Sequence, residues 1–353
     1  MKHGRALLFY AAAMCVVGVA SYACLEGAVR VLNLPDPLLV RDIERELASH
    51  SAGVAASSSP KSVYGWDSEP ITCPEDSRPA GVDSGTAGHV VLFVGDSITR
   101  GYGVDQHTQS YPMLLCHMAS PMVPVRIVNA AVEGFGVDQM IMKLEDIAPH
   151  HRPDLIVFAY IPHDLWRPGR HVHFGATKPV MVANRAGWQT VPAPNTREFY
   201  ESYSAARSRY YLSLWTVGHL VANLRYYLPR VSAGYYRGLF REIRGRLIGL
   251  AQRHGTEVLV VRLASNWPGA AVRMLDRIAT DVFAPSIASG SYRFYDTEEC
   301  VRRKAVASSV QYTEEFKYHP GPNGHRIYAD CLGLILKLAR PVARQPEAVA
   351  QLR

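Results

Sequence analysis

A single small hydroxyl follows a short apolar run in the stretch FVGDSITRGYGV, residues 93–104. The run HVVLFV has the length and the β-branched residues of a buried strand, and Ser97 comes directly after its Gly-Asp turn. A serine hydroxyl is a weak nucleophile at neutral pH and needs a base within hydrogen-bond reach. Ser97 is therefore a candidate nucleophile that requires a partner from elsewhere in the chain.

Two other stretches supply residues of the types that such a nucleophile needs. HPGPNGH near the C-terminus contains His319 and His325, and an imidazole can accept and return a proton near neutral pH. NAAVEGFG contains Asn129 and Gly134, and a glycine N–H can approach a negatively charged oxygen closely because no Cβ stands in the way. Together these residue types favour acyl transfer through an acyl-serine.

The elements that position these residues alternate between strand and helix from residue 89 onward. Strands are predicted at VVLFV, VRIVNA, LIVFAYI, EVLVVRL and YRFYD. Helices are predicted at 112–118, 137–148, 197–228, 235–254 and about 321–338. This order predicts an α/β fold with a parallel sheet covered on both faces. Ligands bind beyond the carboxyl ends of such strands, which is where Ser97 lies.

Four motifs, GDSITRGYGV, NAAVEGFG, YIPHD and HPGPNGH, occur in this order, and the chain thereby resembles the SGNH/GDSL hydrolase superfamily of esterases, lipases and carbohydrate-ester deacetylases. It looks closest to membrane-anchored bacterial members. The resemblance covers about residues 89–340 and implies a three-layer α/β/α sandwich around a central parallel sheet, as in flavodoxin-like folds. It makes Ser97 the nucleophile, His319 the general base, and the backbone N–H groups of Gly134 and Ser97 the oxyanion hole.

Two positions depart from the pattern of that superfamily. Its third motif usually carries Gly-x-Asn-Asp, whereas this chain has Ile161-Pro162-His163-Asp164, so that His163 is expected to donate to the oxyanion from a ring nitrogen. The superfamily also places an aspartate two or three residues before the catalytic histidine, where this chain has Lys317 and Phe316. Glu315 is then the nearest acid able to orient His319, and the catalytic set is Ser97, His319 and Glu315.

The expected function is an extracytoplasmic serine esterase acting on a carboxylic ester, such as an acylated envelope glycan. One alternative is an O-acetyltransferase that passes the acyl group to a cell-surface polysaccharide. Another is a glycan-binding relative with impaired catalysis, which the missing aspartate motivates. The histidine pairs lack metal-ligand spacing, so neither a metal nor a cofactor is expected. The net charge of +7 comes without a dense Lys/Arg block, which argues against nucleic-acid binding.

The N-terminal residues predict a route out of the cytoplasm. Lys2, His3 and Arg5 precede an uncharged run from Ala6 to Leu25, which is long enough for a transmembrane helix with the body of the protein on the far side. A cleaved signal peptide ending near Cys24 and a buried helix are the alternatives. The predicted location is the inner membrane, with one span and a periplasmic catalytic domain.

The predicted organisation is an anchor at 1–34, a flexible linker at 35–88 rich in Ser, Gly, Ala and Pro, a catalytic domain at 89–340 and a disordered tail at 341–353. Residues 166–196 lose periodicity and are predicted to be an insertion in the catalytic domain. Four cysteines lie outside the anchor, at 73, 116, 300 and 331. An oxidising compartment would permit two disulfides, and single buried thiols are the alternative.

Overall fold

The computed structural model describes ten parts of the chain: residues 10, 12–24, 63–73, 89–118, 125–169, 172–173, 176–193, 233–266, 270–284 and 291–338. The chain divides into two compact units. In the smaller unit the described residues form a helix at 12–24 and a short antiparallel hairpin of β5 (Val172–His173) and β6 (Ala176–Thr177). The larger unit holds the central sheet and all four motifs.

The central sheet has six strands in the order β1-β3-β2-β4-β9-β10. Their bounds are β1 Ile71–Thr72, β2 His89–Val94, β3 Val125–Asn129, β4 Leu155–Tyr160, β9 Glu257–Arg262 and β10 Tyr292–Asp296. All five strands predicted from the sequence are present and pair in parallel. The middle strand β4 is buried along its whole length, as expected for a parallel strand covered on both faces.

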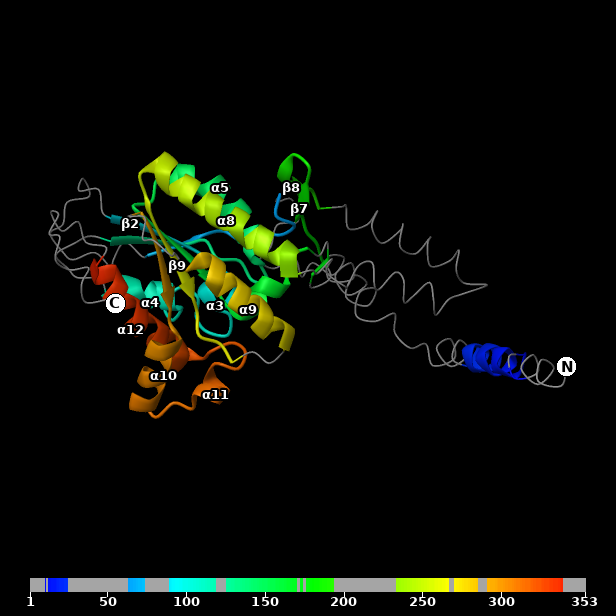
Figure 1. Ribbon diagram of the computed structural model, residues 1–353. Helices are drawn as coiled ribbons and strands as arrows, with labels where there is room; N and C mark the ends of the chain where they lie inside the picture. The colour runs from blue at the N-terminus through cyan, green and yellow to red at the C-terminus, as the bar shows by residue number, and fades with distance from the viewer. Residues whose placement is uncertain are drawn as a thin grey trace, which may run out of the picture. The chain divides into compact units, whose positions relative to one another are not determined.

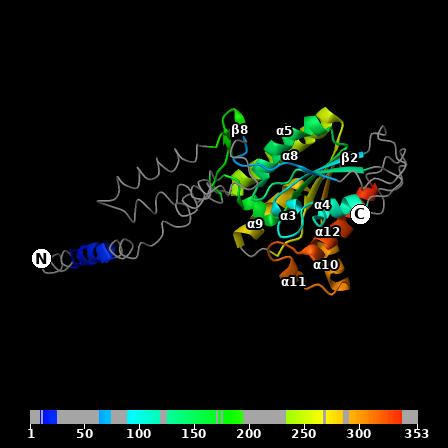
Figure 2. The same ribbon diagram turned by 180° about the vertical axis from the view of Figure 1, so that it is seen from behind.

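Helices cover both faces of this sheet (Figure 1). One face packs against α4 (Tyr111–Met118), α10 (Glu298–Ala307) and α12 (Pro322–Leu338), with Val91 and Phe93 of β2 in its core. The other face is covered by α5 (Val137–His151), α8 (Ala233–His254) and α9 (Ala270–Phe283). Figure 2 shows the same two layers from behind. Alternate strand residues point to opposite faces, so both layers bury apolar side chains.

The expectation of a purely parallel sheet preceded by a transmembrane helix is wrong. Strand β1 pairs antiparallel with β3, so the sheet is mixed, and β1 falls within the range 35–88 that was expected to be a linker. Within the described ranges no helix combines the length and the apolar character that a bilayer crossing requires. The remainder of the anchor and linker predictions, the tail at 341–353 and the helix at 197–228 lie outside the described residues.

The segment at 63–73 is held to the α/β body by polar contacts as well as by β1. Buried Lys143 of α5 pairs with Asp67 and donates to the Ser68 carbonyl at 2.9 Å. The Trp66 indole N–H donates to the carbonyl of Glu133 at 2.8 Å, in the loop that follows β3. This segment therefore supports the loop that carries Gly134.

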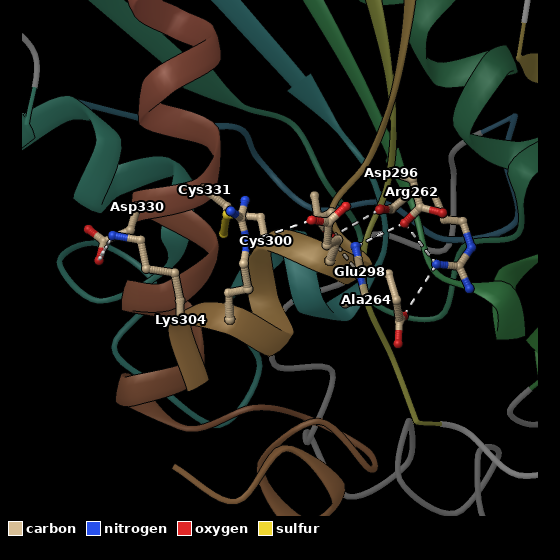
Figure 3. The surroundings of a disulfide bond; sticks show 11 residues. Arg262, Ala264, Asp296, Glu298, Cys300, Lys304, Asp330 and Cys331 are labelled. Carbon is tan, nitrogen blue, oxygen red and sulfur yellow. Dashed lines mark hydrogen bonds and ion pairs between the residues drawn. A yellow bond between two sulfur atoms is a disulfide. The ribbon is translucent and has the colours of Figure 1, made fainter. Parts of the chain in front are cut away.

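Two disulfides join separate elements of this body. Cys73, just after β1, is bonded to Cys116 of α4, and Cys300 of α10 is bonded to Cys331 of α12. Figure 3 shows the second bond between its two helices, beside Arg262, whose guanidinium pairs with Asp296 at 3.0 Å. The cysteines outside the predicted anchor are thus paired, the first of the two alternatives left open by the sequence.

The range 166–196 contains the hairpin β5–β6 and, in the larger unit, a second hairpin of β7 (Val180–Asn184) and β8 (Gly187–Val191). Before it comes η2 (Pro162–Trp166), a short 3₁₀ turn that follows β4. After α10 comes the short helix α11 (Tyr312–Glu315), which leads into the loop that carries His319.

Candidate active site

Ser97 is the first residue of the short helix α3 (Ser97–Arg100) beyond the carboxyl end of β2. The Asp96 side chain caps this helix by accepting the N–H of Ile98 at 3.0 Å. Gly95 is required for the tight turn, because a Cβ there would lie 2.3 Å from Thr99 Oγ1 and 2.9 Å from the carbonyl oxygen of Ala159. The turn thus presents a hydroxyl at the edge of the sheet where the parallel strands end.

The structure brings Ser97 and His319 together across 222 positions of the sequence. Ser97 Oγ lies 2.9 Å from His319 Nε2, within the range of a good hydrogen bond, and 3.3 Å from Asp96 Oδ2. The shorter contact is the one that lets an imidazole take the hydroxyl proton. This pair has the geometry that an activated serine nucleophile requires.

The imidazole of His319 is held by an aromatic ring in addition to the serine. Its ring centroid lies 4.6 Å from that of Tyr102, at an interplanar angle of 46°. The backbone of Tyr102 is tied to the nucleophile, because its N–H donates to the Ser97 carbonyl at 2.8 Å. Although His319 as a residue is exposed, desolvation of its ring lowers its pKa below 6.5, with Asp96 opposing and Arg167 reinforcing this shift. The ring is therefore neutral, and able to act as a base, at neutral pH.

The lowered pKa of His319 predicts the acid limb of the pH profile. Protonation removes the base, so kcat/KM for an ester substrate should fall as the pH decreases, with a midpoint below about 6.5. The measurement is initial rate against pH with a short-chain ester whose own hydrolysis is corrected for. An acid limb centred at or above pH 7 would show that His319 is not the group that titrates, or that its environment differs from this one.

Glu315 is not placed to orient His319, which corrects the expectation that it completes the triad. Its Oε1 accepts the N–H groups of Gly321 and Gly324, both at 2.8 Å, and so caps the beginning of α12. Among the described residues no carboxylate is hydrogen-bonded to His319, whose hydrogen-bond partner there is Ser97. Glu315 lies four positions before His319, and its carboxylate is occupied by the backbone N–H groups at the start of α12.

A pair of Glu315 variants separates a cap from a catalytic acid. Glu315→Gln keeps an oxygen that can accept, so kcat should stay within about twofold of wild type; spoiling a true triad acid costs about 10⁴-fold. Glu315→Ala leaves both N–H groups without their acceptor and should lower the free energy of unfolding by about 1 to 2 kcal/mol. Steady-state kinetics and denaturant unfolding of both variants decide between the two roles.

The second motif lies beside the first through hydrogen bonds of its own. Buried Asn129, the last residue of β3, donates from Nδ2 to the Thr99 carbonyl at 2.8 Å, and the Val132 N–H donates to the Gly95 carbonyl at 3.1 Å. Gly134 follows in a turn with φ of +78°, a left-handed conformation that favours glycine. Among the described residues no acceptor takes the N–H of Gly134 or that of Ser97, as is required of an oxyanion donor.

The third motif brings His163 and a buried charge cluster to the same edge of the sheet. Asp164 accepts the Ile161 N–H at 2.9 Å and pairs with Arg167 at 2.7 Å. Burial raises the pKa of Asp164 well above its ordinary value, and Asp96 raises it further against the opposing effect of Arg167. His163 is half-buried, and its Nδ1 lies 3.3 Å from Arg167 Nη2.

His325 is a core residue rather than part of the reacting pair. It is fully buried, its Nδ1 accepts the Tyr111 N–H at 3.2 Å, and its ring stacks on that of Tyr111. Desolvation lowers the pKa of His325 to about 4, so the ring is neutral under physiological conditions. In the described parts of the chain, no group of three His, Cys, Asp or Glu residues could hold a metal ion.

Tyr102 and Arg167 are the residues that sequence reasoning did not find. Tyr102 lies inside the first motif, but nothing in its position there indicates that its ring meets a histidine 217 residues away. Arg167 follows the third motif at the point where periodicity is lost, and a lone arginine in such a stretch carries no sequence signal. Both roles depend on contacts that form only in the folded chain.

No family model matches the sequence, and no curated protein matches it. The fold is similar to the crystal structure of TesA, at 14% identity and a TM-score of 0.41 over 71% of this chain and 99% of that one. It is also similar to a catalytic mutant of the acetylxylan esterase Axe2 from Geobacillus stearothermophilus, at 15% identity and a TM-score of 0.41 over 72% and 94% of the two chains.

A third similar structure is LAE5, an alpha/beta hydrolase from the metagenome of Lake Arreo, at 15% identity and a TM-score of 0.42 over 72% of this chain and 95% of that one.

Proposed function

We propose that this protein is a serine esterase that hydrolyses a carboxylic ester through an acyl-Ser97 intermediate. The 2.9 Å contact between Ser97 Oγ and His319 Nε2 carries the proposal. The imidazole accepts the hydroxyl proton as Oγ attacks the ester carbonyl, and returns it to the leaving alcohol. Water, deprotonated by the same imidazole, then breaks the acyl-serine bond and releases the acid.

The oxyanion of each tetrahedral intermediate is stabilised by N–H groups from three loops. The backbone amides of Ser97 and Gly134 are two donors, and the His163 ring supplies a third in place of the amide side chain usual in the superfamily. Where one such donor has been removed in other enzymes the loss is about 3 to 4 kcal/mol. The aromatic contact with Tyr102 orients His319, which has no carboxylate partner among the described residues.

The two disulfides support an extracytoplasmic location. Such bonds form and persist in oxidising compartments and are rare where thiols are kept reduced. Both lie in the body that carries Ser97 and His319: one joins the residue after β1 to α4, and the other joins α10 to α12. The proposed site of action is thus outside the cytoplasm, where acylated surface glycans are found.

An acylated carbohydrate is the proposed substrate class. Two exposed aromatic side chains flank the catalytic histidine: Tyr102, 48% exposed, which contacts its ring, and Tyr318, 51% exposed, which precedes it in the chain. Exposed aromatic faces of this kind are suited to stacking on the apolar faces of sugar rings. The positive charge of Lys317 lies over the Tyr318 ring, 5.6 Å from its centroid.

Hydrolysis of p-nitrophenyl acetate and of an acetylated oligosaccharide by the full-length protein tests the proposal. Both activities should be lost in Ser97→Ala. Tyr318→Ala should raise KM for the oligosaccharide severalfold and leave p-nitrophenyl acetate hydrolysis unchanged, because only the oligosaccharide has a sugar face that stacks on the tyrosine ring. Equal effects of Tyr318→Ala on both substrates would contradict the carbohydrate assignment, and hydrolysis that survives in Ser97→Ala would contradict the nucleophile.

A further inference from the structure

One buried guanidinium touches three of the four loops that form the candidate active site. Arg167, only 4% exposed, directly follows η2. Its Nη1 donates to the Phe135 carbonyl at 2.6 Å and pairs with Asp164 at 2.7 Å and with Asp96 at 3.7 Å. Phe135 is the residue after Gly134, so this side chain ties the loop of one oxyanion donor to the loop of the nucleophile.

The other terminal nitrogen of Arg167 determines which ring nitrogen of His163 carries the proton. Nη2 lies 3.3 Å from His163 Nδ1. A guanidinium carries five N–H donors and has no acceptor, so in this contact Nδ1 must accept with its lone pair. A neutral imidazole with an accepting Nδ1 carries its proton on Nε2. The contact therefore selects one of the two tautomers.

That tautomer is the one from which Nε2 can donate to an oxyanion. An asparagine amide always carries two N–H donors, whereas a histidine donates from a given nitrogen only in the right tautomer. The replacement of asparagine by His163 therefore creates a requirement that the usual motif does not have. Arg167, four residues later and directly after η2, meets this requirement.

We propose that Arg167 is a positioning residue that holds the His163 ring in one orientation and in its Nε2–H tautomer, and so makes His163 an oxyanion donor. The inference rests on the proposed esterase function for its catalytic consequence. The competing explanation is that Arg167 only balances the charges of Asp96 and Asp164. The two explanations differ in whether removal of Arg167 changes the tautomer of His163.

The tautomer can be observed without any activity. In the full-length protein labelled with ¹⁵N-histidine, the His163 signals are assigned from their loss in His163→Ala, and long-range ¹H–¹⁵N spectra at pH 8 report which ring nitrogen is protonated. We expect the proton on Nε2. Protonation on Nδ1 would overturn the proposal even if the protein is an active esterase.

Removal of Arg167 is best studied in an Asp164→Asn background, which avoids leaving the buried Asp164 without its cation. In Asp164→Asn alone the Nε2–H tautomer should persist, and with Arg167→Met added a measurable Nδ1–H population should appear. An unchanged tautomer on removal of Arg167 would reduce its role to charge balance. The spectra give this result whether or not the chain turns over an ester.

A double-mutant cycle supplies the kinetic test. In the Asp164→Asn background, His163→Ala should lower kcat by about 10²-fold and Arg167→Met by a smaller factor, both with KM within twofold, and the pair should cost no more than His163→Ala alone. Additive losses, or full kcat in His163→Ala, would contradict action through His163. If Ser97-dependent hydrolysis is absent from the outset, the proposed function fails, and the spectra alone decide the role of Arg167.

Discussion

Ser97→Ala and His319→Gln should each lower kcat for ester hydrolysis by about 10⁴-fold or more, and the double variant should be no slower than the worse of the two. The hydroxyl and the imidazole act as a unit across one 2.9 Å contact, so removing either leaves the other without a function in the reaction. The residual rate of the variants comes from substrate binding and the oxyanion donors. Steady-state kinetics of the three variants with p-nitrophenyl acetate give the result.

A matched histidine change shows that the loss is specific. His254 lies exposed at the end of α8, and His254→Gln should leave kcat unchanged. Ser97→Ala should keep the wild-type unfolding midpoint, because one buried oxygen is removed without creating a cavity of any size. Multiplicative losses in the double variant would show that Ser97 and His319 contribute independently, which the proposed mechanism does not permit.

Removing either disulfide should lower the free energy of unfolding by about 3 to 4 kcal/mol. The bonds close loops of 43 and 31 residues, and constraining loops of this length in the unfolded chain accounts for an effect of this size. The variants are Cys73→Ser/Cys116→Ser and Cys300→Ser/Cys331→Ser, measured by guanidinium chloride unfolding with tryptophan fluorescence. The second pair should loosen α10 from α12, the helix whose start follows His319.

The chain contains its own control for this experiment. Cys15 and Cys24 are unpaired and exposed in the helix at 12–24, so Cys15→Ser/Cys24→Ser should leave the unfolding curve unchanged. Dithiothreitol should shift the midpoint of the wild type toward that of the disulfide variants. A wild-type midpoint that does not respond to reductant would contradict the presence of both bonds and remove the support they give to an oxidising compartment.

The strands of the sheet could be predicted because their signal is local. VVLFV, VRIVNA, LIVFAYI, EVLVVRL and YRFYD are apolar runs of strand length, and each forms a strand in the central sheet. Strand β1 could not be predicted in the same way. It has two residues, and its stability comes from pairing with β3 and from the bond between Cys73 and Cys116, both of which are long-range.

The helices show the same division between local and long-range information. The range 235–254 has helical periodicity and corresponds to α8, whereas α9 and α10 were missed. The N-terminal run resembled a membrane span by the length of its uncharged stretch alone. Among the described residues no helix is both long and apolar enough to cross a membrane, so the length of an uncharged run was not a sufficient signal.

The candidate site was predictable where a residue has one obvious chemical use. A serine in a strand-end turn and a histidine before the last helix meet as expected. Glu315 could not be assigned correctly, because a carboxylate near a helix start has two possible partners: a histidine ring and the backbone N–H groups of the helix. In the structure the Glu315 carboxylate accepts the backbone N–H groups of Gly321 and Gly324.

Reaction of the protein with a fluorophosphonate probe, followed by peptide mass spectrometry, shows whether His319 activates the Ser97 hydroxyl. Such probes form a stable bond with a serine only when its hydroxyl is activated by a base. The proposed mechanism predicts one phosphonylated residue, Ser97, with labelling abolished in His319→Gln and retained in Glu315→Gln. An unmodified Ser97 in folded wild-type protein, or labelling that persists unchanged in His319→Gln, would contradict it.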